Sequence, residues 1–288
     1  MKGKATLAIL ALTAIIGILY FGLKKNVDFS AMQVFETPHF RIYYSSLADG
    51  TKSDIGNTLE KAHPAIQEFF AADRKGKTAV VLYPGVEDFQ KAYLGYFLSM
   101  AYGDWAAGAM YEGQVLAASP ENPGSEKSYG DILQILVHEY VHTWIFHINE
   151  MPNVWLDEGL ASYLAGQKST LPPELPGFDV LQKDDLGVFM DNDGYAIGYS
   201  YISYLDAAYG SEKIIQLIRT NDYESTFGKS AFDVFTEWVR HVEAGIELGT
   251  VVFSRCKIRR DVQSAPAGRP TQPRIISLQG ATQCSNGI

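Results

Sequence analysis

The sequence predicts an α+β fold with a small N-terminal mixed sheet and a mainly helical C-terminal half. Between residues 40 and 119, short stretches alternate between apolar and polar residues, which is typical of strands. From Asp131 to about Gly245, longer segments have the apolar spacing of helices. A length of 288 residues is enough to bury a sizeable core in one or two domains.

The first 25 residues predict a membrane anchor. Lys2 and Lys4 precede an uncharged apolar run over residues 5–23, and Lys24-Lys25 close it. The run is long enough to cross a bilayer as one transmembrane helix. Residues 20–23 make a poor cleavage signal, so we expect an uncleaved signal anchor, with cleavage as the alternative. An N-terminal anchor of this kind predicts a single-pass protein of the cell membrane, with its main domain outside the cytoplasm.

The elements of the first half follow in order along the chain. Pro84-Gly85 ends one strand, and Glu112-Gly113 is expected to form the turn of a hairpin. The predicted elements are a strand over 40–44, a helix over 54–70, a strand over 78–83, a short helix over 87–93 and the hairpin over 107–119.

A helix over residues 131–149 carries the most informative motif of the chain. Its apolar residues lie nearly all round, which indicates a buried helix, and Asp131 is the expected N-cap. His138, Glu139 and His142 form the pattern H-E-x-x-H, which places both imidazoles on one face. Burying these polar groups without partners is costly. A metal ion would satisfy them, and a hydrogen-bond network is the alternative.

A second segment supplies a third candidate ligand. Asn153 is expected to cap a helix whose first turns contain Glu158. Zinc accepts nitrogen and carboxylate ligands and keeps one position open for water in catalytic sites. Glu139 would then lie where it can take a proton from water. The alternative for Glu158 is an exposed carboxylate favoured by the helix dipole.

The stretch H-E-Y-V-H, followed by W-L-D-E-G-L-A-S-Y, resembles the gluzincin metallopeptidases, which include thermolysin and the zinc aminopeptidases. It is most similar to the small bacterial branch called peptidase MA-like. The resemblance implies a zincin-like peptidase domain over 34–248 that acts on peptide or protein substrates. It also implies that His138, His142 and Glu158 bind Zn²⁺ and that Glu139 is the general base.

The related metzincin pattern does not fit this chain. Ile145 and Ile148 occupy the positions where that pattern needs a glycine and a third histidine. His147 is out of register, and we expect it at the surface or beside the site.

The segment Tyr195-Ala196-Ile197-Gly198 resembles the Y-x-x-G segment of the aminopeptidases. The resemblance implies that Tyr195 donates a hydrogen bond to the oxyanion that forms during peptide hydrolysis, with Tyr199 as the second choice. Tyr199, Tyr201 and Tyr204 are more simply explained as core aromatics of a buried helix.

The stretch Gly108-Ala109-Met110-Tyr111-Glu112 is an imperfect match to the G-A-M-E-N segment of the aminopeptidases, because a tyrosine intervenes and no asparagine follows. The blander interpretation is a hairpin strand, and the resemblance to the gluzincins implies that this edge strand pairs through its main chain with an extended substrate. An endopeptidase-like or oligopeptide-binding cleft is therefore favoured over an aminopeptidase pocket.

The last segment differs in composition from the rest. Residues 249–288 are predicted to be a flexible tail, and they contain both cysteines, Cys256 and Cys284, which could pair outside the cytoplasm. The net charge of −9 gives no sign of nucleic-acid binding. The sequence thus predicts a membrane-anchored zinc metallopeptidase and leaves its oligomeric state open. The alternative is an inactive zinc-binding module with a regulatory or peptide-binding role, against which the intact Glu139 argues.

Overall fold

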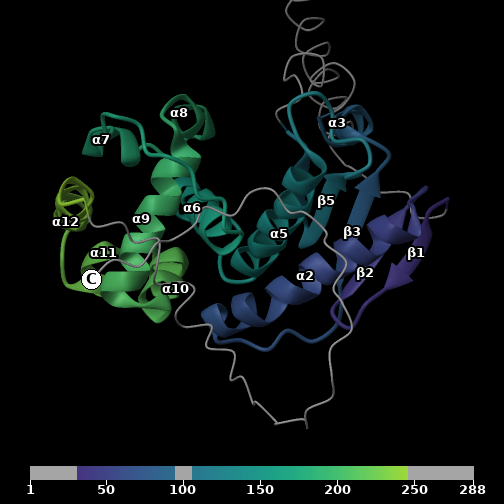
Figure 1. The fold of residues 1–288 in the computed structure, drawn as a ribbon. Coiled ribbons are helices and arrows are strands. Elements are labelled where there is room, and N and C mark those ends of the chain that lie inside the picture. The colour runs from purple at the N-terminus through teal and green to yellow at the C-terminus, as the bar shows by residue number, and fades with distance from the viewer. Residues whose placement is uncertain (1–30, 95–105, 246–288) are drawn as a thin grey trace, which may run out of the picture.

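A computed structural model describes residues 31–94 and 106–245 (Figure 1). Within these residues, no helix combines the length and apolar character needed to cross a membrane. The anchor predicted over residues 1–25 and the tail predicted over 249–288 lie outside the described residues. The model has a five-stranded sheet and a largely helical second half, which confirms the mixed fold predicted from the sequence.

The sheet has the strand order β1-β2-β3-β5-β4. The pairs β2–β3 and β3–β5 are parallel. The two outer strands are antiparallel to their neighbours, β1 to β2 and β4 to β5. The strands are β1 (Gln33–Glu36), β2 (Phe40–Tyr44), β3 (Thr78–Tyr83), β4 (Gly108–Tyr111) and β5 (Gln114–Ala118). The mixed sheet predicted from the sequence is therefore present, and β4 lies at its edge.

The β4–β5 hairpin turns where the sequence predicts it. Glu112 and Gly113 both have positive φ angles, 48° and 77°. Two such residues in a row form the tight turn whose twist matches that of the flanking strands. Because β5 lies between β3 and β4, its residues from Val115 to Ala118 are buried.

Helices cover both faces of the sheet. Helix α2 (Asp49–Phe70) connects β2 to β3, and α3 (Val86–Leu94) follows β3. Phe40, Ile42 and Val80 share a core cluster with α2, whereas Val81 and Leu116 pack with α3 on the other side. Helix α2 begins five residues earlier than predicted. The prediction missed its first turn, because the residues that follow Asp49 are mostly polar and lack the apolar spacing of a helix.

The second half is built from helices, as the sequence predicts. They are α5 (Tyr129–Phe146), α6 (Val154–Leu164), α7 (Phe178–Leu181), α8 (Leu186–Asp191), α9 (Gly194–Tyr209), α10 (Ser211–Thr220), α11 (Tyr223–Phe227) and α12 (Ala231–Glu243). Helix α5 contacts β4 and β5 as well as α2 and α6, so it joins the sheet to the helical half.

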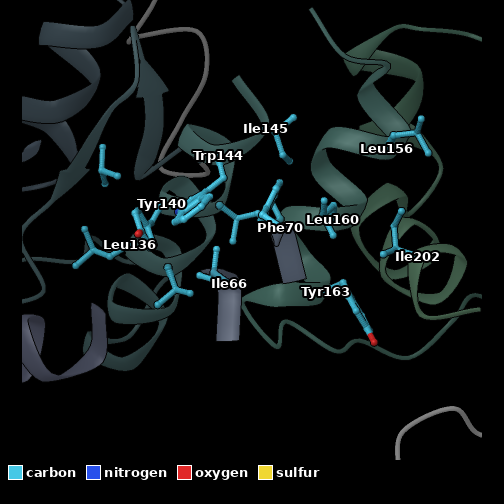
Figure 2. Packing of buried hydrophobic residues seen from close by; sticks show 14 of the residues in the cluster. Ile66, Phe70, Leu136, Tyr140, Trp144, Ile145, Leu156, Leu160, Tyr163 and Ile202 are labelled. Atoms are coloured by element: carbon cyan, nitrogen blue, oxygen red, sulfur yellow. The ribbon is translucent and has the colours of Figure 1, made fainter. Parts of the chain in front are cut away.

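The main core forms where α5 meets α2 and α6. Figure 2 shows Ile66 and Phe70 of α2, Trp144 of α5 and Leu160 of α6 in this region. Phe70 and Trp144 stack with ring centroids 5.4 Å apart. Fully burying each such side chain contributes about 1.5–3 kcal/mol to folding, so α5 is held firmly along its length.

Two glycines allow α6 and α9 to approach closely. A Cβ on Gly159 would lie 3.0 Å from the carbonyl oxygen of Gly198, and a Cβ on Gly198 would lie 2.9 Å from Gly159 Cα. These neighbours are backbone atoms, so a side chain at either position would push the helices apart. The close contact fixes the position of Glu158 on α6 relative to Tyr195 on α9.

Candidate metal centre

Helix α5 is set by a capping box at its first turn. The Ser128 side chain accepts a hydrogen bond from the backbone N–H of Asp131, and the Asp131 side chain accepts one from the backbone N–H of Ser128. The expected N-cap, Asp131, was therefore wrong: Ser128 caps the helix and Asp131 is its third residue. The two interactions satisfy two backbone donors reciprocally, a pattern that S-Y-G-D conceals because the third position holds Asp rather than Glu.

The helix is also anchored from behind. The Tyr140 hydroxyl lies 2.6 Å from His63 Nδ1, and Arg74 donates to the Thr143 hydroxyl over 2.7 Å. Burial raises the pKa of Tyr140 to about 12, so its hydroxyl stays protonated. These contacts tie α5 to α2 and to the loop after it, on the side away from the two motif histidines.

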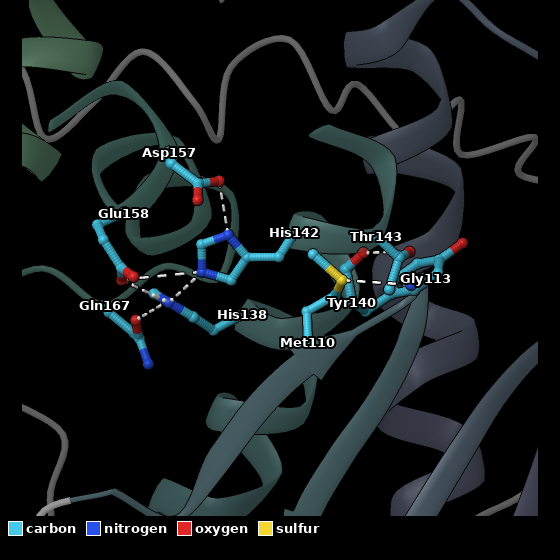
Figure 3. Close-up of polar contacts among 9 residues, drawn as sticks. All are labelled: Met110, Gly113, His138, Tyr140, His142, Thr143, Asp157, Glu158 and Gln167. Atoms are coloured by element: carbon cyan, nitrogen blue, oxygen red, sulfur yellow. Dashed lines mark hydrogen bonds and ion pairs between the residues drawn. The ribbon is translucent and has the colours of Figure 1, made fainter. Parts of the chain in front are cut away.

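His138 and His142 present their Nε2 atoms to each other over 3.0 Å. On the opposite side of each ring, His138 Nδ1 lies 2.7 Å from the amide oxygen of Gln167, and His142 Nδ1 lies 2.7 Å from Asp157 Oδ1 (Figure 3). An amide or carboxylate oxygen accepts, so each Nδ1 must donate. In the neutral rings, both Nε2 lone pairs then point at the same space.

Glu158 completes a three-residue group on this space. Its Oε2 lies 3.2 Å from His138 Nε2 and 3.8 Å from His142 Nε2. His138, His142 and Glu158 each offer one ligand atom, and these atoms lie within 4.8 Å of one another. When both imidazole rings are neutral, none of these three atoms carries a proton, so their lone pairs repel one another. A cation between them removes that repulsion. The group could therefore hold a metal ion.

A proton on His142 can also reduce this repulsion between lone pairs. Burial alone would lower the pKa of His142, but the negative charges of Asp157 and Glu158 outweigh it and hold that pKa well above its usual value. Burial would likewise raise the pKa of Glu158, yet the adjacent His142 and His138 keep it well below its usual range. A metal ion and a proton thus compete for His142 Nε2, so metal binding is expected to release a proton.

Glu139 is buried beside this group, and burial raises the pKa of its carboxyl group. Its side chain lies against Gly108 of the edge strand, where an added Cβ would come within 3.0 Å of Glu139 Cγ and Oε1. The glycine of β4 therefore leaves the space that the Glu139 carboxylate occupies. An added Cβ would also collide with Ile135 Cγ2, so the close packing of α5 on this strand favours a glycine at its start.

A cavity of about 450 Å³ opens next to these residues. Its walls come from residues 106–108 where β4 begins, the middle of α5, the loop after α6, the end of α8 and the start of α9. Its lining includes Gly108, Ile135, His138, Glu139, Gln167, Met190 and Tyr195. The cavity gives the candidate metal group an open side large enough for a section of peptide.

Tyr195 and Tyr199 have different surroundings. Tyr195 lines the cavity, and its ring centroid lies 6.1 Å from that of His138. Tyr195 is 36% exposed, and the partial burial of its hydroxyl beside Glu158 and Glu139 raises the pKa of that group, which therefore stays a donor. Tyr199 packs on Tyr163, with ring centroids 5.5 Å apart, and is not part of the cavity lining. Tyr201 and Tyr204 are buried, as expected for core aromatics of this helix.

The remaining expectations near the site can also be placed. Asn153 caps α6 by accepting a hydrogen bond from the Trp155 N–H, as predicted. His147 is exposed at the end of α5, which is one of the two positions expected for it. Helix α5 ends at Phe146 rather than Asn149, because the next residues turn tightly and Asn149 bonds to the Ile218 carbonyl.

Two residues of the site were missed at the sequence level. Asp157 and Gln167 orient the two histidines, but neither belongs to the H-E-x-x-H motif. Asp157 could have been noticed, because a carboxylate next to the third ligand on a helix is within reach of a ligating histidine. Gln167 could not, because it lies in a loop whose path depends on how α6 ends.

A search with protein-family models found no match to this chain. A search among curated proteins found none either. The resemblance to the gluzincins therefore stays a prediction that rests on the residues of the motif.

Proposed function

We propose that the chain is a zinc-dependent metallopeptidase. The observation that carries this proposal is the pair of oriented histidines. Both Nδ1 atoms are used by acceptors, so both Nε2 lone pairs meet Glu158 Oε2 beside an open cavity and a buried Glu139. Tetrahedral ligands at 2.0–2.1 Å from zinc lie about 3.3 Å apart. The separations of 3.0, 3.2 and 3.8 Å fit such a site closely.

When bound, the zinc ion would lower the pKa of a water molecule and polarise the carbonyl group of the scissile bond. Glu139 accepts the proton from the attacking water, and it later passes that proton to the leaving amine. The raised pKa of Glu139 suits both steps, because it brings the carboxyl group closer to neutral pH. Among the described residues, β4 is the outer strand of the sheet next to the cavity, and the backbone of an extended peptide would pair with it.

The anchor and localisation are part of the same proposal. We infer from the apolar run over residues 5–23 that a single helix holds the peptidase domain at the outer side of the cell membrane. A substrate would then be a peptide or protein outside the cytoplasm. The domain needs no disulfide for its core, since the described residues contain no cysteine.

Metal removal tests the proposal directly. The purified full chain is expected to carry about one zinc ion and to cleave members of a broad peptide library. Chelation should abolish cleavage, and added Zn²⁺ should restore it. Metal content is measured by elemental analysis, and cleavage by mass spectrometry of the digest. Stoichiometric zinc without cleavage of any peptide would favour the inactive binding module instead.

Tyr195→Phe removes one hydroxyl at nearly constant volume. If Tyr195 donates to the charge that develops on the carbonyl oxygen, kcat should fall roughly a hundredfold while KM changes little, because this interaction forms mainly in the transition state. Tyr199→Phe is the matched control on the same helix and should change kcat little, since Tyr199 packs on Tyr163. If only Tyr199→Phe slows the reaction, the role belongs to Tyr199.

A further inference from the structure

The cavity beside the candidate metal group has an unequal charge distribution. Apart from His138 and Glu139, the charged side chains that line it are Lys127 and Lys168. They come from different segments, Lys127 from the residue before the N-cap of α5 and Lys168 from the loop after α6. Two cations thus converge on one cavity in a chain whose net charge is −9.

Lys168 is fixed near the reacting groups by its neighbour. Gln167 holds His138 Nδ1 over 2.7 Å, so the backbone of this loop is held at the same end of the cavity as the first metal ligand. The Lys168 side chain is exposed, and within residues 31–94 and 106–245 it forms neither a hydrogen bond nor an ion pair. Its ammonium group is therefore available to a molecule in the cavity.

Lys127 has a weaker claim to the same role. It lies close enough to Asp131 to lower the pKa of that carboxyl group, after the larger effect of the hydrogen bonds to Ser128. Part of its charge is thus offset by Asp131. Lys127 adds to the positive potential of the cavity, while Lys168 is the residue that can contact a ligand directly.

We propose that Lys168, assisted by Lys127, binds a carboxylate of the peptide substrate. This inference rests on the proposed peptidase function and names its substrate class. The carboxylate comes either from an Asp or Glu side chain near the scissile bond or from a free C-terminus. In both cases an ammonium group in a partly enclosed cavity meets an anion, and such charge-assisted hydrogen bonds are stronger than neutral ones.

The test compares three peptides on the metal-loaded full chain. All share one neutral sequence. The first peptide has an amidated C-terminus, and the third has a free C-terminus. The second is an amidated set in which one Glu is placed in turn at each position around the scissile bond. The wild type is expected to cleave a carboxylate-bearing peptide with a kcat/KM about two- to fivefold above that of the neutral one, because a partly exposed ion pair is modest in strength. Which of the two is preferred identifies the source of the carboxylate.

Variants of Lys168 make the test specific. Lys168→Gln should lower kcat/KM for the carboxylate-bearing peptide until it equals that for the neutral peptide, and Lys168→Arg should keep the preference. Lys75→Gln is the matched control, because Lys75 is exposed in the loop between α2 and β3 and does not line the cavity. Raising the salt concentration should weaken the preference of the wild type, since exposed charges are screened.

The outcomes separate this inference from the proposed function. Cleavage of all three peptides at equal kcat/KM, or a preference that survives in Lys168→Gln, would overturn the role of Lys168 and leave the peptidase intact. Failure of the metal-loaded wild type to cleave any peptide would overturn the peptidase and this inference together.

Discussion

Glu139→Gln is expected to lower kcat for peptide hydrolysis by on the order of a thousandfold while the fold and the bound metal stay unchanged. Proton transfer by a positioned side chain contributes about 10² to 10⁴ in rate, and a glutamine amide cannot accept the proton from water. Glutamine has nearly the same size as glutamate, so it fits the space that Gly108 leaves beside position 139. The variant therefore isolates the chemical role from packing.

The measurement combines single-turnover kinetics with elemental analysis on the same preparations. Circular dichroism and thermal unfolding check that the fold is retained. Within residues 31–94 and 106–245, the Glu139 carboxyl group forms no hydrogen bond that the variant would lose, and its burial even disfavours the charged form. Stability is thus expected to stay the same or rise slightly. A fully active Glu139→Gln variant would refute the general-base mechanism.

The matched control is Gln134→Glu, which introduces a carboxylate on the same helix. Gln134 also lines the cavity, but its side chain donates to the Ala165 carbonyl and is not part of the three-residue group. Adding this carboxylate to Glu139→Gln should not restore hydrolysis. Restoration would mean that any carboxylate in the cavity suffices, and the position of Glu139 would then carry no special meaning.

The helices and turns that could be predicted from the sequence are those with a clear signal in their own residues. Helix α5 and helix α6 have continuous apolar patterns, and the β4–β5 turn contains Gly113, whose positive φ is the conformation that glycine adopts most easily. These signals are local. The start of α2 was misplaced because its first turn is held by polar contacts such as Lys52–Asp49, which leave no hydrophobic period to detect.

The candidate site was predictable in part for the same reason. His138 and His142 lie one helical turn apart, so their shared face follows from the sequence alone. Their orientation does not, because it depends on Asp157 and Gln167, which come from a second helix and from a loop. The close approach of α6 and α9 was also hidden, since it needs Gly159 and Gly198 to meet across 39 residues of chain.

His142→Ala is expected to leave the purified chain with zinc well below one ion per molecule. Removing one of three protein ligands takes away a metal bond, and it also leaves Asp157 without the imidazole that it holds at 2.7 Å. Hydrolysis should fall with the metal content. Because stoichiometric zinc in this variant would mean that the metal lies elsewhere, elemental analysis after dialysis decides the question.

His147→Ala is the matched control for this loss. His147 ends the same helix, but it is exposed and does not belong to the three-residue group, so zinc should remain stoichiometric. Asp157→Asn provides a graded step between the two. It keeps an acceptor for His142 Nδ1 but removes the charge, and loss of such an orienting partner typically weakens metal binding about 10- to 100-fold. A zinc affinity of Asp157→Asn between those of the wild type and His142→Ala would show that the Asp157 carboxylate strengthens zinc binding through His142.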